Sequence, residues 1–255
     1  MNFQQFSLMR FSGFFSLISI VVGLFFGSIV LYKAIKKKEK ILLLFFFTII
    51  FVLSPWFPSG FGYLYWLITS QDLSYTAYVF LGTAGIPIAI ISWLEIYLST
   101  ILPKKKKILV LIYILFSIIF EFYLIYFLFW APSAPVESLI GIIPNPENPM
   151  DIDYQGFIFV YLLISIILAV GTGLHFSLIS MHIKEDPLIV WKGRFLFLGF
   201  SFFCFSAIFD ALFKITLFLL MIIRISLILA IFFFYAGFIS PKWLKNILSI
   251  PSDKE

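Results

Sequence analysis

The sequence predicts an all-α integral membrane protein, a polytopic bundle of seven transmembrane helices. Of the 255 residues, 62% are hydrophobic and only 12% are charged, whereas a soluble domain carries about 25% charged residues. The apolar residues also fall into runs near or above the ~20 residues that cross a ~30 Å hydrocarbon layer. The predicted spans cover residues 11–32, 41–57, 75–101, 108–130, 157–181, 194–214 and 216–239.

The first span, 11–32, is predicted to be a retained helix and not a secretory signal. A signal peptide carries basic residues before its apolar segment and a small-residue cleavage site after it. In this chain the lysine cluster at 36–40 follows the apolar segment, and no A-x-A pattern is present.

Proline and glycine interrupt the second and third spans. The second span, 41–57, is the shortest and runs into residues 54–58, which include two prolines. We therefore expect its helix to break there, near the membrane interface. In the third span, 75–101, Gly85 and Pro87 are expected to bend the helix beside a cavity.

The last two spans and the tail complete the predicted architecture. Only residues 214–216 separate the sixth span from the seventh, which predicts a tight hairpin. Beyond the seventh span, apolar residues at positions 243, 244, 247 and 248 share one helical face and predict a short helix on the inner leaflet. We divide the chain into a transmembrane domain, 1–240, and a cytoplasmic tail, 241–255.

The basic residues predict the orientation of the chain. Most of the 18 Lys and Arg residues follow the first, third, fifth and seventh spans, whereas the opposite connections, 58–74 and 131–156, contain acidic residues and no basic ones. The positive-inside rule then places the N-terminus outside and the C-terminus in the cytoplasm. The clustered residues are Lys33, Lys36, Lys37, Lys38, Lys40, Lys104 to Lys107, Lys184, Lys192, Arg194, Lys242, Lys245 and Lys254.

Rare residue types exclude several kinds of chemistry. Cys204 is the single cysteine, so an internal disulfide is excluded. His175 and His182 are the only histidines, too few for a three-histidine zinc site. The chain contains no phosphate-binding, zinc-protease or serine-hydrolase motif. Its net charge of +5 comes from basic residues that cluster between the spans, which indicates membrane topology. We expect no cofactor, no metal, no nucleic-acid partner and no enzymatic activity; intramembrane catalysis ranks third among the interpretations.

Ionisable side chains inside the spans are the candidate site residues, because a charge at the bilayer centre costs at least ~2.5 kcal/mol. At ~1.5 Å per residue, Glu121 and Arg224 both lie roughly 13 Å from the outer ends of their spans. We therefore expect them to be neighbours or to share water. Glu95 and His175 lie at ~10 Å from the inner ends and form the second candidate pair.

Two interpretations of these pairs stay open: a buried polar clamp that fixes helix packing, or a ligand or ion site. Asp210 and Lys214 stand at i and i+4, the spacing of an intrahelical ion pair near the outer interface. The alternative for Lys214 is a retinal Schiff base, but microbial rhodopsins carry that lysine within the last helix.

Two stretches carry a family resemblance. Residues 81–97, which begin Leu-Gly-Thr-Ala-Gly-Ile-Pro, and residues 192–210, which begin Lys-Gly-Arg, resemble the seven-helix sensor module at the N-terminus of some prokaryotic histidine kinases. The resemblance implies sensing of an outer or membrane-embedded ligand. Because the sequence contains no kinase domain, we expect a partner to supply the output.

The leading functional hypothesis is a multi-pass protein of the cell membrane that acts as a receptor, sensor or scaffold. It would take a small-molecule or lipid ligand and contact a cytoplasmic signalling partner through its inner loops and the helix near Trp243. The alternative is a small transporter or channel component whose Glu95, Glu121, His175 and Arg224 line a polar path. An outward-facing pocket closed below favours sensing, whereas a continuous cavity open to alternate sides favours transport.

Overall fold

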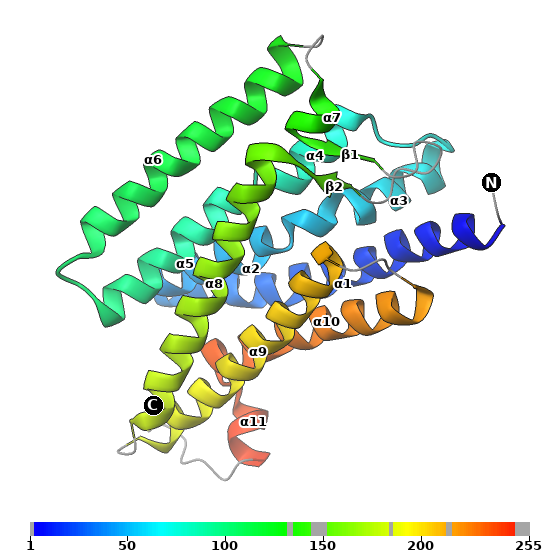
Figure 1. Cartoon of the computed structure of the whole chain (residues 1–255). Coiled ribbons are helices and arrows are strands. Elements are labelled where there is room, and N and C mark those ends of the chain that lie inside the picture. Colours follow the sequence, from blue (N-terminus) through cyan, green and yellow to red (C-terminus); the bar gives the residue numbers. More distant parts are fainter. Residues whose placement is uncertain (1–2, 132–134, 144–151, 184–185, 213–215, 248–255) are drawn as a thin grey trace.

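The computed structural model describes residues 3–131, 135–143, 152–183, 186–212 and 216–247. The described chain is a bundle of helices with one two-stranded antiparallel sheet, in which Gly141 pairs with Tyr154 (Figure 1). The α-helices are α1 (Phe3–Lys37), α2 (Lys40–Val52), α3 (Phe57–Thr69), α4 (Tyr75–Thr83), α5 (Ile86–Ile101), α6 (Lys106–Ile125), α7 (Val136–Leu139), α8 (Gly156–His182), α9 (Pro187–Leu212), α10 (Leu217–Ile239) and α11 (Lys242–Ile247). A short 3-10 helix, η1 (Ser54–Trp56), a short π-helix, η2 (Tyr126–Trp130), and the strands β1 (Gly141–Ile142) and β2 (Asp153–Tyr154) complete the described elements.

Seven helical segments of the described chain are long and apolar enough to cross a membrane. This confirms the predicted helical class and the predicted number of candidate spans. The short helix predicted after the seventh span is also present, as α11. The segments are Arg10–Lys37, Lys40–Thr69, Tyr75–Ile101, Lys106–Trp130, Gly156–His182, Pro187–Asp210 and Phe218–Ile239.

The second segment is longer than predicted. Its helix breaks at η1, as expected, but resumes as α3 and continues to Thr69. Pro55 and Pro58 each stand in the first turn of the element they begin, where proline's missing N–H would have had no helical partner. Gly60 then lets α3 lie directly against α1, because a Cβ there would come within 3.0 Å of the Leu17 backbone nitrogen.

The third segment, which was expected to bend, is interrupted between α4 and α5 at Ala84 and Gly85. A Cβ on Gly85 would lie 3.0 Å from the Cβ of Ser54, so the break in the third segment packs against the break in the second. The two interruptions therefore coincide in space, and the candidate site described below lies beside them.

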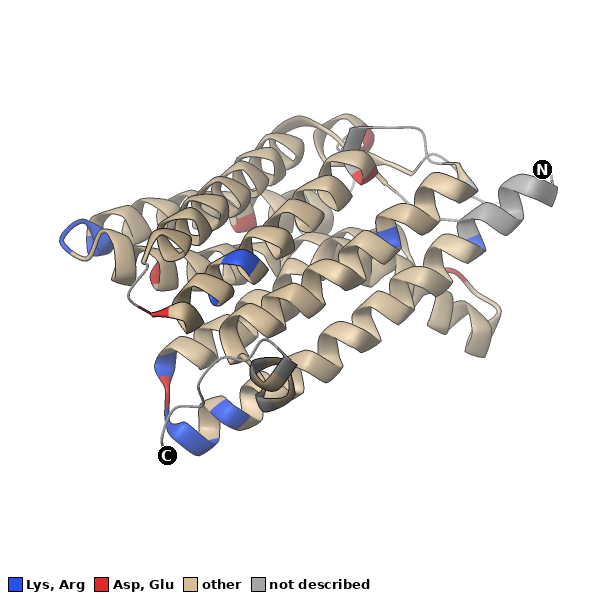
Figure 2. Cartoon of the chain, turned by 90° about the horizontal axis from the view of Figure 1, so that it is seen from below, with Lys and Arg blue, Asp and Glu red and all other residues tan. Residues whose placement is uncertain are grey.

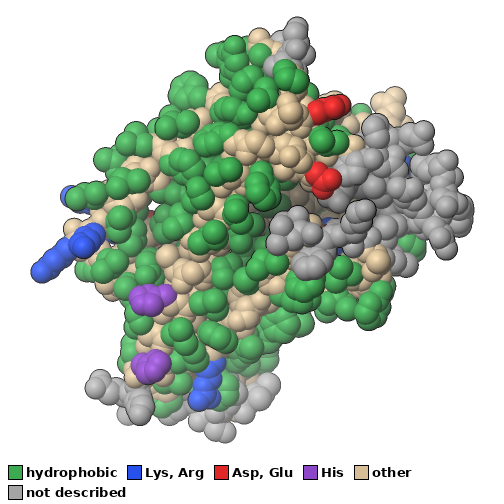
Figure 3. All heavy atoms as spheres, in the orientation of Figure 1, with side chains coloured by type: hydrophobic (Ala, Val, Ile, Leu, Met, Phe, Trp, Pro, Cys, Tyr) green, Lys and Arg blue, Asp and Glu red, His purple; other side chains and the backbone are tan. Residues whose placement is uncertain are grey.

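The charged residues are distributed unevenly over the bundle. Most Lys and Arg segments gather at the end that carries α11, which we call the lysine end (Figure 2). Hydrophobic side chains cover most of the visible surface in Figure 3. The α7, β1 and β2 segment lies at the opposite end of the bundle (Figure 1), which we call the loop end.

Candidate ligand-binding cavity

A cavity of about 460 Å³ opens in the loop-end half of the bundle. It lies where the interrupted second and third segments face α8, α9 and α10. Ligand pockets for small molecules have volumes of about 300–1,000 Å³ and mostly apolar walls with a few polar groups. The walls here fit that description: their apolar side chains include Phe51, Val52, Ile86, Ala89, Ile90, Leu162, Leu163, Ile166, Phe203 and Ala207.

One corner of the cavity is an ionic cluster built by α9, α10 and η1. Arg224 Nη1 donates hydrogen bonds to both carboxylate oxygens of Asp210, at 3.2 and 3.1 Å, and Nη2 donates to Ser12 Oγ at 3.4 Å. Trp56 Nε1 donates to Asp210 Oδ2 at 2.6 Å. The side chain of Arg224 is 3% exposed and that of Asp210 is 23% exposed. Pairing compensates the cost of burying the guanidinium.

The guanidinium keeps hydrogen-bonding capacity that the cluster does not use. Arginine has five N–H donors, and the buried Nε of Arg224 has no hydrogen-bond partner among the described residues. A buried donor without a partner is unfavourable. Arg224 and Asp210 both line the cavity, and Asp210, whose side chain is 23% exposed against 3% for Arg224, is the member of the pair that a bound molecule can reach.

The loop-end wall of the cavity is fixed to the bundle by hydrogen bonds. Residues 152–155 line the cavity. Gln155 N donates to Ile140 O at 2.8 Å, and the hydroxyl groups of Tyr75 and Tyr123 donate to Gly141 O at 2.8 Å and to Leu139 O at 3.0 Å. Two different helices thereby hold α7, β1 and β2 in place.

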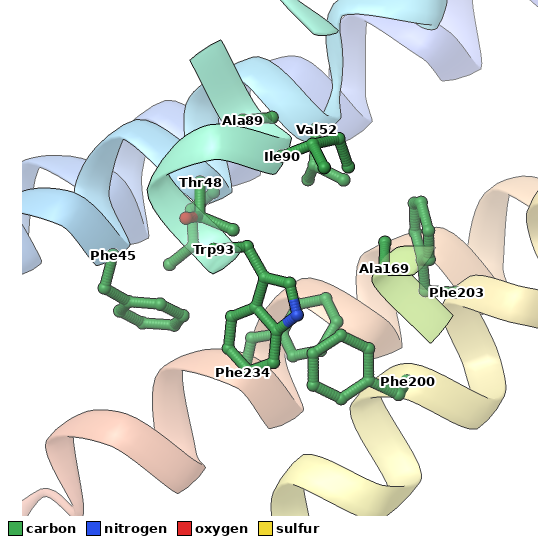
Figure 4. Close-up of a pocket in the computed structure, with 11 residues that line it drawn as sticks. Phe45, Thr48, Val52, Ala89, Ile90, Trp93, Ala169, Phe200, Phe203 and Phe234 are labelled. Carbon is green, nitrogen blue, oxygen red and sulfur yellow. The ribbon is translucent and has the colours of Figure 1, made fainter. Parts of the chain in front are cut away.

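An aromatic layer lies on the lysine side of the cavity, around a second and much smaller void whose lining is drawn in Figure 4. The Trp93 and Phe200 rings lie 4.9 Å apart, and the Phe200 and Phe234 rings 4.8 Å apart, centroid to centroid. Trp93 Nε1 donates to Thr172 Oγ1 at 2.8 Å, which fixes the indole. A void of about 20 Å³, lined by apolar side chains and Thr48, lies among these rings. We call Trp93, Phe200 and Phe234 the aromatic floor.

The expected pair of Glu121 and Arg224 is not formed. Arg224 binds Asp210 instead, and α6, which carries Glu121, packs against α5 and α8, whereas α10 packs against α9 and α1. Equal depth of two Cα atoms says nothing about which helices are neighbours. In addition, the long Arg224 side chain reaches along the helix toward the loop end, where the Asp210 carboxylate lies.

Glu95 and His175 also bind other partners. Glu95 Oε1 lies 2.7 Å from Lys106 Nζ and 3.6 Å from Lys40 Nζ, whereas His175 Nδ1 shares a hydrogen bond of 2.9 Å with the Tyr97 hydroxyl. Helices α5 and α8 are neighbours, as the pairing requires. Glu95 nevertheless turns to the lysine end, where the two ammonium groups are available.

The predicted pair of Asp210 and Lys214 cannot be compared with the structure, because Lys214 lies outside the described residues. Asp210 itself accepts hydrogen bonds from Arg224 and Trp56. A sequence spacing of i and i+4 identifies a partner on the same helix, whereas both of these donors come from other elements.

A buried hydroxyl cluster between α6 and α8 was not predicted. The Tyr113 hydroxyl donates to Tyr161 at 3.1 Å and shares a 2.8 Å hydrogen bond with Ser165, while Ser117 Oγ lies 2.9 Å from the Tyr161 hydroxyl. The sequence did contain a clue: the two polar residues on each helix are four positions apart, which places them on the same helix face. Ser165 also lines the cavity, so the cluster joins the cavity wall to α6.

Fold and cavity together define an α-helical bundle with seven segments long and apolar enough to cross a membrane and with a cavity of ligand-binding size in one half. Comparison of the chain with protein-family models, with curated proteins and with solved structures finds no match. Among the described residues, no group of three or more His, Cys, Asp or Glu side chains is arranged to hold a metal ion. The chemistry available at the cavity is therefore that of its apolar walls, its ionic cluster and its hydroxyl groups.

Proposed function

We propose that the chain is a receptor-like protein of the cell membrane that binds a small molecule or lipid in the cavity and acts through a cytoplasmic partner. The N-terminus and the loop end face outward, and the lysine end with α11 faces the cytoplasm, in agreement with the positive-inside rule. The protein is proposed to act by binding and not by catalysis. The observation that carries the proposal is a cavity of about 460 Å³ with the aromatic floor on its lysine side.

The shape of the cavity supports binding over transport. A transport path needs a polar route that continues to the other side of the bundle. Among the rings below this cavity lies a void of about 20 Å³, and Glu95, farther toward the lysine end, is paired with Lys106 at 2.7 Å.

Helices α9 and α10 offer a route from the cavity to the proposed cytoplasmic face. Both line the cavity near their connected ends, through Asp210 and Arg224. They pack closely below it, because a Cβ on Gly237 would lie 3.2 Å from the Lys192 carbonyl oxygen. At the lysine end Phe232 stacks on Trp243 of α11. A ligand that shifts the ionic cluster would therefore move a packed pair of helices that ends beside α11.

Identification of co-purified molecules tests the proposal. The full chain is extracted in mild detergent, separated from free lipid and denatured, and the released compounds are identified by mass spectrometry. Wild type should release one compound in near-stoichiometric amount. Ile166→Trp, which fills the cavity from α8, should lose that compound by about tenfold or more.

The adjacent substitution Ile167→Trp is the matched control. Ile167 is not among the residues that line the cavity and is 61% exposed, so Ile167→Trp should retain the compound. Equal retention by Ile166→Trp and Ile167→Trp, or no specific compound in any of the three proteins, would refute cavity binding.

A further inference from the structure

The cavity occupies one half of the depth of the bundle. Ala169, at its lower limit, lies in the middle of the 27-residue helix α8. Arg224 lies seven residues into α10, about 10 Å from the helix start. If the seven segments cross a bilayer, the cavity therefore lies within a single leaflet, with its ionic cluster in the outer part of the apolar layer.

Helices α8 and α9 are tightly packed below the cavity. There a Cβ on Gly193 would lie 2.9 Å from the Ser177 carbonyl oxygen, and Gly173 faces the Phe200 ring. Toward the loop end the two helices diverge (Figure 1). Leu163 on α8 and Ile208 on α9 line the cavity there and still keep more than a third of their surface exposed. The cavity is therefore open sideways, between two apolar helix faces.

The charges around the cavity select the polar part of the occupant. The charged side chains among the described lining residues are Asp153, Asp210 and Arg224, a net charge of −1. An anionic head group would be repelled, whereas a neutral hydroxyl group can bind the carboxylate of the ion pair. It can donate a hydrogen bond to the partly exposed Asp210 carboxylate, which has about four lone-pair sites and accepts three hydrogen bonds.

We infer that the occupant is a neutral, hydroxyl-bearing lipid with one hydrocarbon chain, which enters from the bilayer between α8 and α9. Its hydroxyl group binds the cluster of Asp210 and Arg224, and its chain lies along the apolar wall toward the aromatic floor. This inference rests on the proposed function, since it specifies the ligand of the same cavity.

Photolabelling in a defined bilayer tests the inference. The full chain is placed in phosphatidylcholine nanodiscs with a monoacylglycerol that carries a diazirine in its chain, or with a lysophosphatidic acid that carries the same chain. After irradiation, adducts are mapped by peptide mass spectrometry. The monoacylglycerol should label cavity-facing positions of α8 and α9, about tenfold more than the anionic probe does.

Two substitutions on α9 test the entry route. Ile208 and Leu198 are both 39% exposed, but only Ile208 lines the cavity. Ile208→Trp should reduce cavity labelling about tenfold, and Leu198→Trp should leave it unchanged. Both variants are first compared with wild type by gel filtration and thermal unfolding. If Ile208→Trp unfolds, Leu163→Trp narrows the same opening from α8.

The outcomes separate this inference from the proposed function. Equal labelling by the neutral and anionic probes, or labelling that the narrowing substitution does not reduce, overturns the lipid inference. If a water-soluble compound is then released by wild type and lost in Ile166→Trp, the cavity still binds a ligand and the receptor proposal stands. If no compound is released and neither probe labels the cavity, both proposals fail.

Discussion

Arg224 is the residue whose environment most constrains the site. Its guanidinium is buried beside a single carboxylate, that of Asp210. Removing one member of a buried ion pair leaves the other charge uncompensated, which costs about 3–5 kcal/mol in soluble proteins. Replacing both members removes the charge as well, so the double substitution should be less harmful than the two single ones predict.

A double-mutant cycle measures this coupling. We expect Asp210→Asn and Arg224→Gln each to destabilise the protein, and the double variant to recover at least about 1 kcal/mol relative to the sum of the two effects. The measurement is the free energy of unfolding in detergent micelles. Simple additivity would show that the ion pair does not stabilise the fold.

Glu121 supplies the control for that cycle. The sequence places it at the same depth as Arg224, but the structure places it on a helix that does not pack against α10. Glu121→Gln combined with Arg224→Gln should therefore be additive within about 0.5 kcal/mol. A larger coupling energy would restore the pairing expected from depth alone.

The glycines of α8 show how single elements shape the cavity. Gly173 faces the Phe200 ring of α9, whereas nothing lies within 4 Å of a Cβ placed on Gly171. Close packing at Gly173 brings α8 and α9 together at the aromatic floor. The same two helices diverge on the loop-end side of the aromatic floor, and the cavity lies between them there.

Substitution at these two positions should have opposite effects on stability. Gly173→Ala forces the Phe200 ring to move and should cost about 1–3 kcal/mol. Gly171→Ala enters open space and should be neutral or stabilising by up to about 1 kcal/mol, because alanine favours the helix. Thermal unfolding of the purified variants provides the comparison, and equal melting temperatures would argue against the described packing of α8 on α9.

The elements were more predictable from the sequence than the contacts between them. Runs of apolar residues identify the seven segments, and the prolines at 55, 58 and 87 identify the places where helices break. The continuation of the second segment to Thr69 was missed because the same prolines are also compatible with the start of a new helix. The partners of Arg224 and Glu95 depend on how each helix is rotated and on how far a long side chain reaches, which span depth does not encode.

The whole molecule is polarised along the bundle axis. The cavity, the ionic cluster and the β1–β2 pair lie at the loop end, and most Lys and Arg segments lie at the lysine end (Figure 2). A receptor that detects a ligand on one side and contacts a partner on the other needs this separation. The aromatic floor lies between the two halves, so the proposed receptor function requires that changes at the cavity reach the lysine end through helix movement.

Cysteine labelling in intact cells tests the proposed orientation. Cys204→Ser removes the single native cysteine, and Gln71→Cys or Lys105→Cys then places one thiol at an exposed position at the loop end or the lysine end. A membrane-impermeant maleimide should modify Gln71→Cys in intact cells and Lys105→Cys only after lysis, because basic connections stay in the cytoplasm. The Cys204→Ser protein without a new cysteine measures background. The reverse labelling pattern would show that the chain has the opposite orientation in the membrane. Labelling of both positions from outside would contradict an odd number of membrane crossings between residues 71 and 105.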